Sequence, residues 1–333
     1  GMVDIDYTML LRNSNEVWDI SNSVTQVRYK CFHIGRCGVL TFNIIQENVS
    51  SNPAFNIENG NKITFEYKGK KIFCGYVFKI EYDFDGTYNV TCYDQLKYLM
   101  YNYSYVFVNK TASEIITSIA NEFQLTIGDI EDTKFAIPRY APKNKKLFDI
   151  IYDALRITGD NSGSSFCLYD DYGKLTLKEV NKMKTDLTIS PAVNLTNFKF
   201  TKDITNAYTK FIVASNYNDD ASTTDELYTA NQWQDDELIK KWGILQYFEV
   251  AKEGLTQEQI KQKIETLSKI HAQEKQSITI DAAGEFVRAG EIISVEIKKY
   301  DIKQYFLIEE ASHTWNGGMD YNMTLTLKGG VIN

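Results

Sequence analysis

The sequence has few of the residues from which disulfide frameworks and metal sites are built. Its 333 residues include 5 Cys and 3 His, and no two cysteines form a CxxC pair. An odd number of cysteines is a poor disulfide framework, so we expect free thiols in a reducing compartment. The sequence also lacks any run of about 18 apolar residues, which predicts a soluble chain made in the cytoplasm without a membrane anchor.

Catalytic motifs are missing as well. The sequence contains no G-x-S-x-G, H-E-x-x-H or G-x-x-x-x-G-K-[ST] motif. Cys31, His33 and Cys37 offer three possible metal ligands on one strand face, but structural zinc normally has four ligands at defined spacings. Packing in a core or at a sheet edge explains these residues equally well. His271 and His313 would need a nucleophile and an orienting carboxylate in reach, so we expect no catalytic residue, metal site or cofactor.

Clustered positive charge is the next absence. The chain has 36 Lys and Arg against 44 Asp and Glu, which gives a formal net charge of −8. A nucleic-acid-binding surface needs clustered Lys and Arg to displace counterions. The charge therefore argues against specific nucleic-acid binding, but it leaves open a channel along which nucleic acid passes without binding.

Adjacent acidic residues leave one alternative function open. A glycosidase holds two carboxylates about 5 to 9.5 Å apart across a sugar cleft, whereas adjacent acids in loops are usually solvated turns. Because aromatic-rich β-proteins often bind sugars, a cell-wall-directed carbohydrate-binding or hydrolytic module remains the alternative. The acid pairs are Asp170-Asp171, Asp219-Asp220, Asp235-Asp236 and Glu309-Glu310.

Aromatic residues are abundant and proline is scarce. The 22 Tyr and 18 Phe, with only 4 Pro, favour strands that have half-buried faces. Apolar and polar alternation predicts strands at residues 7–11, 24–29 and 39–44. The proline-containing stretch 133–146 and the polar stretch 216–226 are predicted to be loops.

Helices are marked by capping boxes and apolar spacing. A T-x-x-E box at Thr111 and a T-x-x-Q box at Thr256 each satisfy backbone donors at a helix start. In the helix after Thr256, apolar residues share one face and Lys261, Lys263 and Lys269 share the wet one. The predicted helices cover residues 111–123, 147–158, 236–241 and 257–273, with a hairpin of 166–169 and 174–177.

One three-strand pattern occurs twice in the chain. Each copy opens on a glycine, Gly60 or Gly290, and continues as a mixed apolar and polar strand to a lysine. A second strand, a glycine-containing turn and a last strand beginning at Tyr88 or Tyr321 follow. We therefore predict two small β-domains of one plan. The predicted turn and repeat positions are Gly60, Gly86, Gly290, Gly317 and Gly318.

The order of these elements predicts a mainly β fold with an α+β insert. Two similar, small, β-barrel-like tube domains flank a helix-containing middle domain. The predicted bounds are 2–100 for the first tube domain, 101–194 for the insert and 195–333 for the second tube domain. The last of these contains the long helix at about 257–273.

The ending His313-Thr314-Trp315-Asn316-Gly317-Gly318-Met319-Asp320-Tyr321-Asn322-Met323 and the Trp242-Gly243 element before the long helix complete a familiar pattern. Together with the duplicated β-domains and the insert, they make the chain resemble phage tail baseplate hub proteins of the XkdQ/YqbQ, PBSX prophage-like family. The resemblance covers nearly the whole chain and rests on element order and short strand signatures. It extends distantly to contractile-tail hubs and to the hub part of type VI spikes, whose β-helical needle this chain lacks.

This resemblance implies a structural protein rather than an enzyme. Three copies with two tube domains each would form a pseudo-sixfold ring that joins a hexameric tail tube to a trimeric spike. The implied partners are a second and third copy of the chain, the tail tube protein and a spike or other baseplate protein. The implied location is the virion tail baseplate after assembly in the host cytoplasm, with a negatively charged lumen for passive DNA passage.

Overall fold

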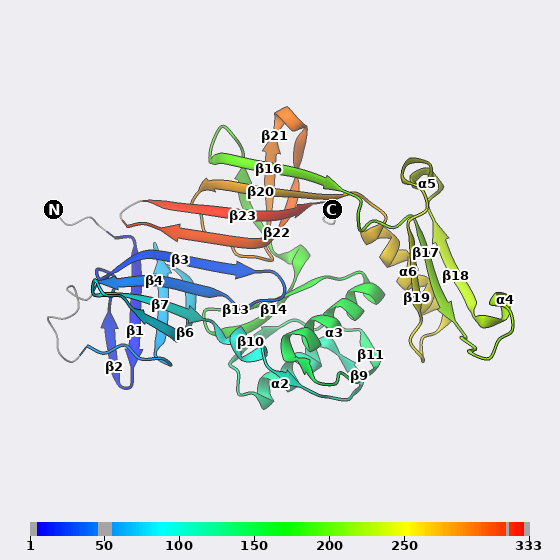
Figure 1. Cartoon of the computed structure of the whole chain (residues 1–333), viewed down its shortest axis with the longest axis horizontal. Helices are drawn as coiled ribbons and strands as arrows, with labels where there is room; N and C mark the ends of the chain where they lie inside the picture. Colours follow the sequence, from blue (N-terminus) through cyan, green and yellow to red (C-terminus); the bar gives the residue numbers. More distant parts are fainter. Residues whose placement is uncertain (1–4, 46–54, 318–319, 330–333) are drawn as a thin grey trace.

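The computed structural model describes residues 5–45, 55–317 and 320–329 (Figure 1). Its largest element is a 13-stranded sheet to which both ends of the chain contribute. The main strand order is β16-β20-β23-β22-β3-β4-β7-β6-β5-β1-β2, while β21 lies beside β22 and β15 beside β21. Within the described residues this sheet is open and does not close into a barrel. The predicted mainly β fold with an α+β insert is confirmed.

The first half of the sheet is built from the N-terminal strands. Alternate residues of β1, including Met9 and Leu11, are buried, because successive side chains of a strand point to opposite faces. The three strands predicted between residues 7 and 44 are confirmed. The strands are β1 (Tyr7–Asn13), β2 (Glu16–Asp19), β3 (Val24–Phe32), β4 (Val39–Ile45), β5 (Lys62–Tyr67), β6 (Lys70–Tyr82) and β7 (Thr87–Tyr93).

The second half of the sheet has the same order of strands. In the first half the order is β3-β4-β7-β6-β5, and in the second it is β16-β20-β23-β22-β21. The duplication predicted from three strands therefore extends to five. The elements are β15 (Lys184–Ile189), β16 (Leu195–Asp203), β20 (Lys275–Ala283), β21 (Ile292–Ile297), η3 (Lys298–Tyr300), β22 (Ile302–Trp315) and β23 (Tyr321–Gly329).

The insert is a separate apolar core of helices and short strands. The predicted capping box is present, since the Thr111 hydroxyl accepts the Glu114 N–H and the Glu114 carboxylate accepts the Thr111 N–H. The insert comprises η1 (Gln95–Leu99), β8 (Asn102–Tyr103), β9 (Phe107–Thr111), α2 (Ala112–Glu122), β10 (Ile127–Ile130), β11 (Ala136–Tyr140), β12 (Lys145–Lys146), α3 (Leu147–Ser162), β13 (Phe166–Asp171), β14 (Lys174–Glu179) and η2 (Val180–Lys182).

The prediction of a loop at 133–146 was wrong in part. The strand β11 lies in this stretch and pairs with β9 through Ile137 and Arg139 on either side of Pro138. β11 pairs with β9 alone, and proline is tolerated on an edge strand because its missing N–H removes no bond from a second neighbour.

A further small sheet carries the long helix. The apolar face of α6 covers Phe211 and Val213 of β17 with Ile260, Ile264 and Leu267. Its elements are β17 (Lys210–Ser215), α4 (Thr224–Leu227), β18 (Thr229–Gln234), α5 (Asp236–Trp242), β19 (Gln246–Val250) and α6 (Gln257–His271). This unit lies at the right of Figure 1, where α6 approaches α3 of the insert.

Two expectations for this unit need correction. The stretch 216–226, predicted as a loop, runs into the short helix α4. Lys263, predicted on the wet face of α6, is buried and forms an ion pair with Glu249 at 2.6 Å. Burial of the lysine is possible because the carboxylate on β19 pairs with its charge.

Candidate assembly interface

The same backbone turn precedes β5 in the first half of the large sheet and β21 in the second. Gly60 and Gly290 each have a φ of +94°, which L side chains rarely adopt. The Gly60 N–H donates to the Val77 carbonyl at 2.7 Å, and the Gly290 N–H donates to the Ile308 carbonyl at 2.8 Å. The matching bonds make Val77 of β6 equivalent to Ile308 of β22.

The residue after each of these glycines closes the turn with its side chain. The Asn61 Oδ1 accepts the Glu58 N–H at 2.7 Å, and the Glu291 Oε1 accepts the Arg288 N–H at 2.7 Å. An amide in one copy and a carboxylate in the other thus perform one role. Because the residue types differ, an alignment of the two segments by residue identity does not reveal that Asn61 and Glu291 are equivalent.

A later glycine also recurs in both halves. Gly86 and Gly317 each have a φ of +86°. Gly318 lies outside the described residues. That the five glycines are equivalent structural positions of one repeat stays a prediction.

A bulge in each half fixes the register of the two copies. The β6–β7 ladder shifts between Val77 and Lys79, and the β22–β23 ladder shifts between Ile308 and Glu310. Each bulge directly follows the residue that accepts the glycine N–H, so the strands can be aligned beyond it. The equivalent residues are Lys79 and Glu310, Ile80 and Ala311, Glu81 and Ser312, and Tyr82 and His313.

This register shifts the last strand of the repeat by two residues. Tyr88 lies opposite Tyr82, and Met323 lies opposite His313. Tyr88 is therefore equivalent to Met323 and not to Tyr321, with which the sequence pattern aligned it. Beyond the bulge the late ladder has six residue pairs and the early ladder has four, so the longer strands of the late copy displace the tyrosine.

The two halves meet where β22 pairs with β3. One edge of β22 is covered by β23, and the other is covered first by β21 and then by β3. Three residues of β22 on this second stretch are buried, with exposed fractions of 0% for Ala311, 0% for His313 and 2% for Trp315. The junction is therefore a continuous part of the main core.

His313 is held in this core as a neutral imidazole. Its Nε2 donates to the Val287 carbonyl at 2.7 Å, and its Nδ1 accepts the Tyr321 hydroxyl at 2.7 Å. Burial lowers the pKa of His313 to about 4, because a buried imidazolium loses its hydration. The residue is a structural histidine with both ring nitrogens satisfied.

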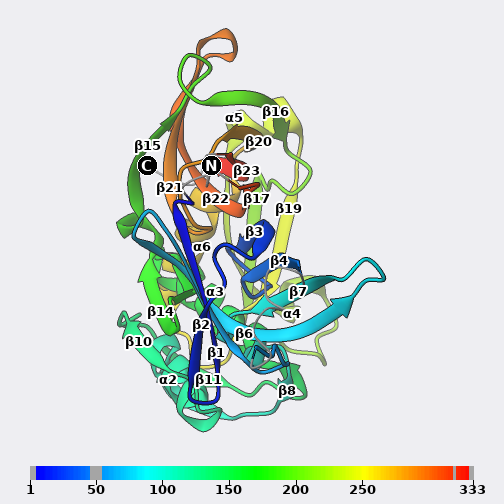
Figure 2. The ribbon, with the colours of Figure 1, turned by 90° about the vertical axis from the view of Figure 1, so that its left-hand side faces the viewer.

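In the first half the equivalent edge carries no strand. β5 pairs with β6 only as far as Tyr76, and the stretch from Lys79 to Tyr82 pairs with β7 alone among the described residues. Figure 2 shows the β6–β7 hairpin extending to the right, away from the rest of the chain. At the opposite end of the sheet, β16 pairs with β20 alone. The end of β6 and the outer edge of β16 are thus available for pairing, as are the outer edges of β2 and β15, which each pair with one strand among the described residues.

The open edge of β6 also exposes large aromatic side chains. Tyr82 has an exposed fraction of 63%, and Phe84 in the following turn is fully exposed. Their counterparts in the second half are His313 and Trp315, both buried. Sequence reasoning missed Tyr82 and Phe84 as candidate interface residues. The signal that could have found them is the aromatic character shared by these two positions of the repeat.

Arg288 and Asp94 join the insert to the two half-sheets. Its Nη1 donates to the Asp170 carbonyl of the insert at 3.1 Å, and its guanidinium lies 4.9 Å above the Tyr169 ring. The nearby Asp94 accepts the N–H groups of Gly38 and Leu96. Burial raises the pKa of the Asp94 carboxyl well above its usual range. Polar contacts therefore fix the insert against both half-sheets.

The structure separates the three residues considered as metal ligands. Cys31 belongs to the core of the large sheet, where its Sγ accepts the Ala289 N–H at 3.2 Å. Cys37 belongs to the core of the insert. His33 is buried, and burial lowers its pKa to about 4. Within the residues that the structure describes, no three His, Cys, Asp or Glu side chains gather as a metal site.

The acid pairs are likewise scattered through the fold. They occupy four different elements or loops: Asp170-Asp171 in β13, Asp219-Asp220 before α4, Asp235-Asp236 at the start of α5 and Glu309-Glu310 in β22. Each of the four acid pairs therefore lies on a different element or loop from the other three.

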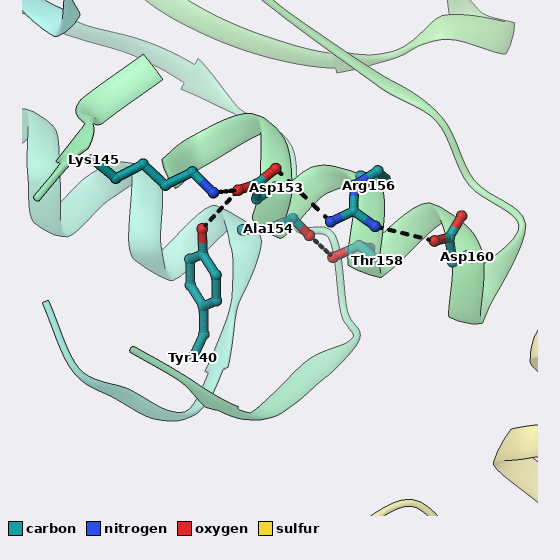
Figure 3. A network of polar contacts seen from close by, with 7 residues as sticks. All are labelled: Tyr140, Lys145, Asp153, Ala154, Arg156, Thr158 and Asp160. Atoms are coloured by element: carbon teal, nitrogen blue, oxygen red, sulfur yellow. Dashed lines mark hydrogen bonds and ion pairs between the residues drawn. The ribbon is translucent and has the colours of Figure 1, made fainter. Parts of the chain in front are cut away.

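A hollow of about 580 Å³ beside α3 contains other acids. In Figure 3, Asp153 faces Lys145 and Arg156, and Arg156 also faces Asp160, at 3.5 Å from the Asp160 carboxylate. The Tyr140 hydroxyl donates to Asp153 at 3.4 Å. Asp153 and Asp160 are thus each paired with a cation, as in a structural ion network. No helix among the described residues is long and apolar enough to span a membrane.

Comparison with known proteins gives a consistent result. The sequence model of the YQBQ-like family matches residues 27–328 of this chain. The phage-like element PBSX protein XkdQ of Bacillus subtilis (strain 168) is 28% identical over 267 residues, which cover 79% of this chain and 80% of XkdQ. The resemblance predicted from the sequence is therefore confirmed.

Solved structures share the fold. The 43 kDa tail protein of prophage MuSo2 from Shewanella oneidensis has a TM-score of 0.70 at 13% identity, covering 98% of this chain and all of that protein. The c3393 protein of E. coli is described as a type VI secretion component similar to the T4 phage tail proteins gp27 and gp5. It has a TM-score of 0.56 at 10% identity, covering 92% of this chain and 73% of c3393.

Proposed function

The chain belongs to the YQBQ-like family, and we propose that it is a structural, non-enzymatic hub of a contractile phage or phage-tail-like bacteriocin baseplate. Three copies form a pseudo-sixfold ring that joins the tail tube to the central spike. The hub is part of the virion tail and assembles in the bacterial cytoplasm. Residues 2–100 and 195–333 supply the two tube domains, and residues 101–194 supply the insert.

The observation that carries this proposal is the tandem duplication. Two half-sheets with the same strand order lie side by side in one chain and are joined through β22 and β3. A chain with two similar units can present six units from three copies. Such a ring matches a hexameric tail tube on one face and a trimeric spike on the other. This symmetry matching explains why one chain contains two similar units.

The charge of the chain supports the same proposal. A net charge of −8 disfavours binding of nucleic acid to a lumen wall, because bound phosphates need Lys and Arg. In a particle that carries DNA, the genome would pass through the ring without being held. The proposed protein partners are the tail tube protein and a spike or other baseplate protein.

The proposal is tested by the absolute mass of the purified chain. Light scattering behind a sizing column, over a concentration series, is expected to give three times the mass of one chain. A tail tube protein from a particle of the same kind, added to the same sample, is expected to co-elute with the trimer. A chain that stays monomeric and binds neither the tube protein nor the spike protein would overturn the proposal.

A further inference from the structure

We propose that the open edge of β6 pairs antiparallel with the open edge of β16 from a second copy of the chain, in a defined register. This inference rests on the proposed hub and names the contact that closes its ring. Both edges are without a strand partner beyond β7 and β20, respectively, in the portion of the chain that the structure describes. In each case the pairing strand comes from a second copy of the chain: its β16 pairs with β6, and its β6 pairs with β16.

The in-chain junction supplies the geometry of this contact. By the register of the two copies, β6 is equivalent to β22, and β16 is equivalent to β3. The chain thus already contains one β22–β3 pairing, and the β6–β16 pairing is the same contact formed between copies. A head-to-tail contact of this kind leaves one open edge at each end until the ring closes.

The ladders fix which residues of β16 correspond to those of β3. Tyr29 lies opposite Leu40, and Phe200 lies opposite Ile278. Leu40 lies opposite Cys92, and Ile278 lies opposite Leu327, and both Cys92 and Leu327 flank the equivalent bulges. Phe200 of β16 is therefore equivalent to Tyr29 of β3.

The pairing within the chain then gives the pairing between copies. In the chain, β22–β3 aligns Glu310 with Phe32 and His313 with Tyr29. The corresponding pairs between copies are Lys79 with Asp203, Ile80 with Lys202, Glu81 with Thr201 and Tyr82 with Phe200.

Charges on one face of this ladder are complementary. Lys79 lies opposite Asp203, so opposite charges meet at one end. One position beyond the end of β6, Asp83 lies opposite Lys199, and the signs are reversed. Directly opposed charges of unlike sign stabilise a strand pair, whereas like charges destabilise it. A register shifted by two residues would place Lys79 opposite Thr201 and would lose both matches.

The other face of the ladder carries the aromatic residues, next to the pair of Ile80 with Lys202. Tyr82 meets Phe200, as His313 stacks on Tyr29 within the chain at 6.4 Å. Phe84, which is fully exposed, follows toward Phe198 of the second copy, as Trp315 lies opposite Val27. Phe198 and Phe200 are already packed against the rim of the main core. The pairing therefore extends the core across the boundary between copies and buries the exposed aromatic side chains.

Cysteine pairs test the contact and its register. Glu81→Cys with Thr201→Cys places two cysteines directly opposite each other, on strands whose Cα atoms lie about 4.5–5.5 Å apart. Glu81→Cys with Lys199→Cys is the matched control, because its diagonal spacing of about 7–8 Å is too long for a disulfide. All these side chains are exposed, and the five native cysteines are buried, so mild oxidation reports on the new pairs.

The expected result is an interchain disulfide for the opposed pair and at least a tenfold slower reaction for the diagonal pair. Denaturing electrophoresis without reductant is expected to show species up to three chains and none larger. Absence of the opposed cross-link would overturn this pairing, while a trimer by light scattering in the same samples would leave the proposed hub standing. Equal reaction of both pairs would overturn the register, and a ladder beyond three chains would overturn the closed ring.

Discussion

The two halves of the large sheet differ at equivalent positions of one hairpin. His313 and Trp315 on β22 have exposed fractions of 0% and 2%, whereas Tyr82 is 63% exposed and Phe84 is fully exposed. The local strand order is the same in both halves. The difference is that β3 lies along β22, while no strand within the described residues lies along the end of β6. Burial of these positions is thus decided by the neighbouring half-sheet and not by the strand itself.

Truncating Trp315, at the end of β22, or its counterpart Phe84, in the turn after β6, gives the largest contrast. We expect Trp315→Ala to lower the free energy of unfolding by about 3–5 kcal/mol, because it removes a buried indole that packs against Phe65 and Tyr321. The matched variant Phe84→Ala is expected to change it by less than about 0.5 kcal/mol, because the side chain is solvated. Urea unfolding followed by circular dichroism measures both.

Equal losses for these two variants would contradict the comparison. A large loss for Phe84→Ala measured on a monomer would mean that the side chain is buried within its own chain. Unchanged stability with reduced self-association would agree with a role at the boundary between copies.

The opening glycines give the next contrast. Gly60→Ala and Gly290→Ala both place a side chain at a φ of +94°, and we expect a strain of about 1–2 kcal/mol in each. At Gly60 the added methyl group meets open space, whereas at Gly290 it overlaps the Cys167 sulfur of the insert. Overpacking adds about 1–3 kcal/mol at Gly290 alone.

The midpoints of urea unfolding, compared at equal slope, measure this difference. The double variant Gly290→Ala with Cys167→Ala is the control, since it removes the overlapping sulfur and retains the strain. If Gly290→Ala were no more costly than Gly60→Ala, the insert would not be packed tightly against the second half-sheet.

Local signals in the sequence predicted the elements well. The helix starts at Thr111 and Thr256 follow from side chains that cap the backbone three residues ahead, and both boxes are present. The failures concern non-local partners. Pro138 lies in a strand because β9 pairs around it, and Lys263 is buried because Glu249 on β19 pairs with its charge.

The interface was the hardest feature to predict. The sequence pattern aligned Tyr88 with Tyr321, and only the bulge positions corrected the register by two residues. The pairing of β22 with β3 joins segments about 280 residues apart, and no local propensity encodes such a contact. The exposed state of Tyr82 follows from the absence of such a neighbour, so a sequence reading of strand composition could not distinguish it from His313.

The last contrast is the pH dependence of stability that His313 causes. His313 is buried, and its pKa is lowered to about 4, chiefly by burial and in addition by Arg288 and Lys70. An unfolded histidine has a pKa of about 6.5. Between these values the unfolded chain binds the proton and the folded chain does not, so stability is present above pH 6.5 and is lost as the pH falls toward 4.

We expect His313 to account for a loss on the order of 2 kcal/mol between pH 7 and pH 4.5. Thermal unfolding of the wild type and of His313→Gln across this range measures its share, because glutamine keeps a donor and an acceptor but does not titrate there. His33, whose pKa is also lowered to about 4, contributes in the same direction, so the difference between the two proteins is the relevant quantity. An equal pH slope in both would mean that His313 is hydrated in the folded chain. The equivalent position of the first half is occupied by Tyr82, which has no imidazole. A steeper dependence of stability on pH in the wild type than in His313→Gln would therefore show that the two copies differ in more than sequence. They would also differ in the environment that the neighbouring half-sheet creates.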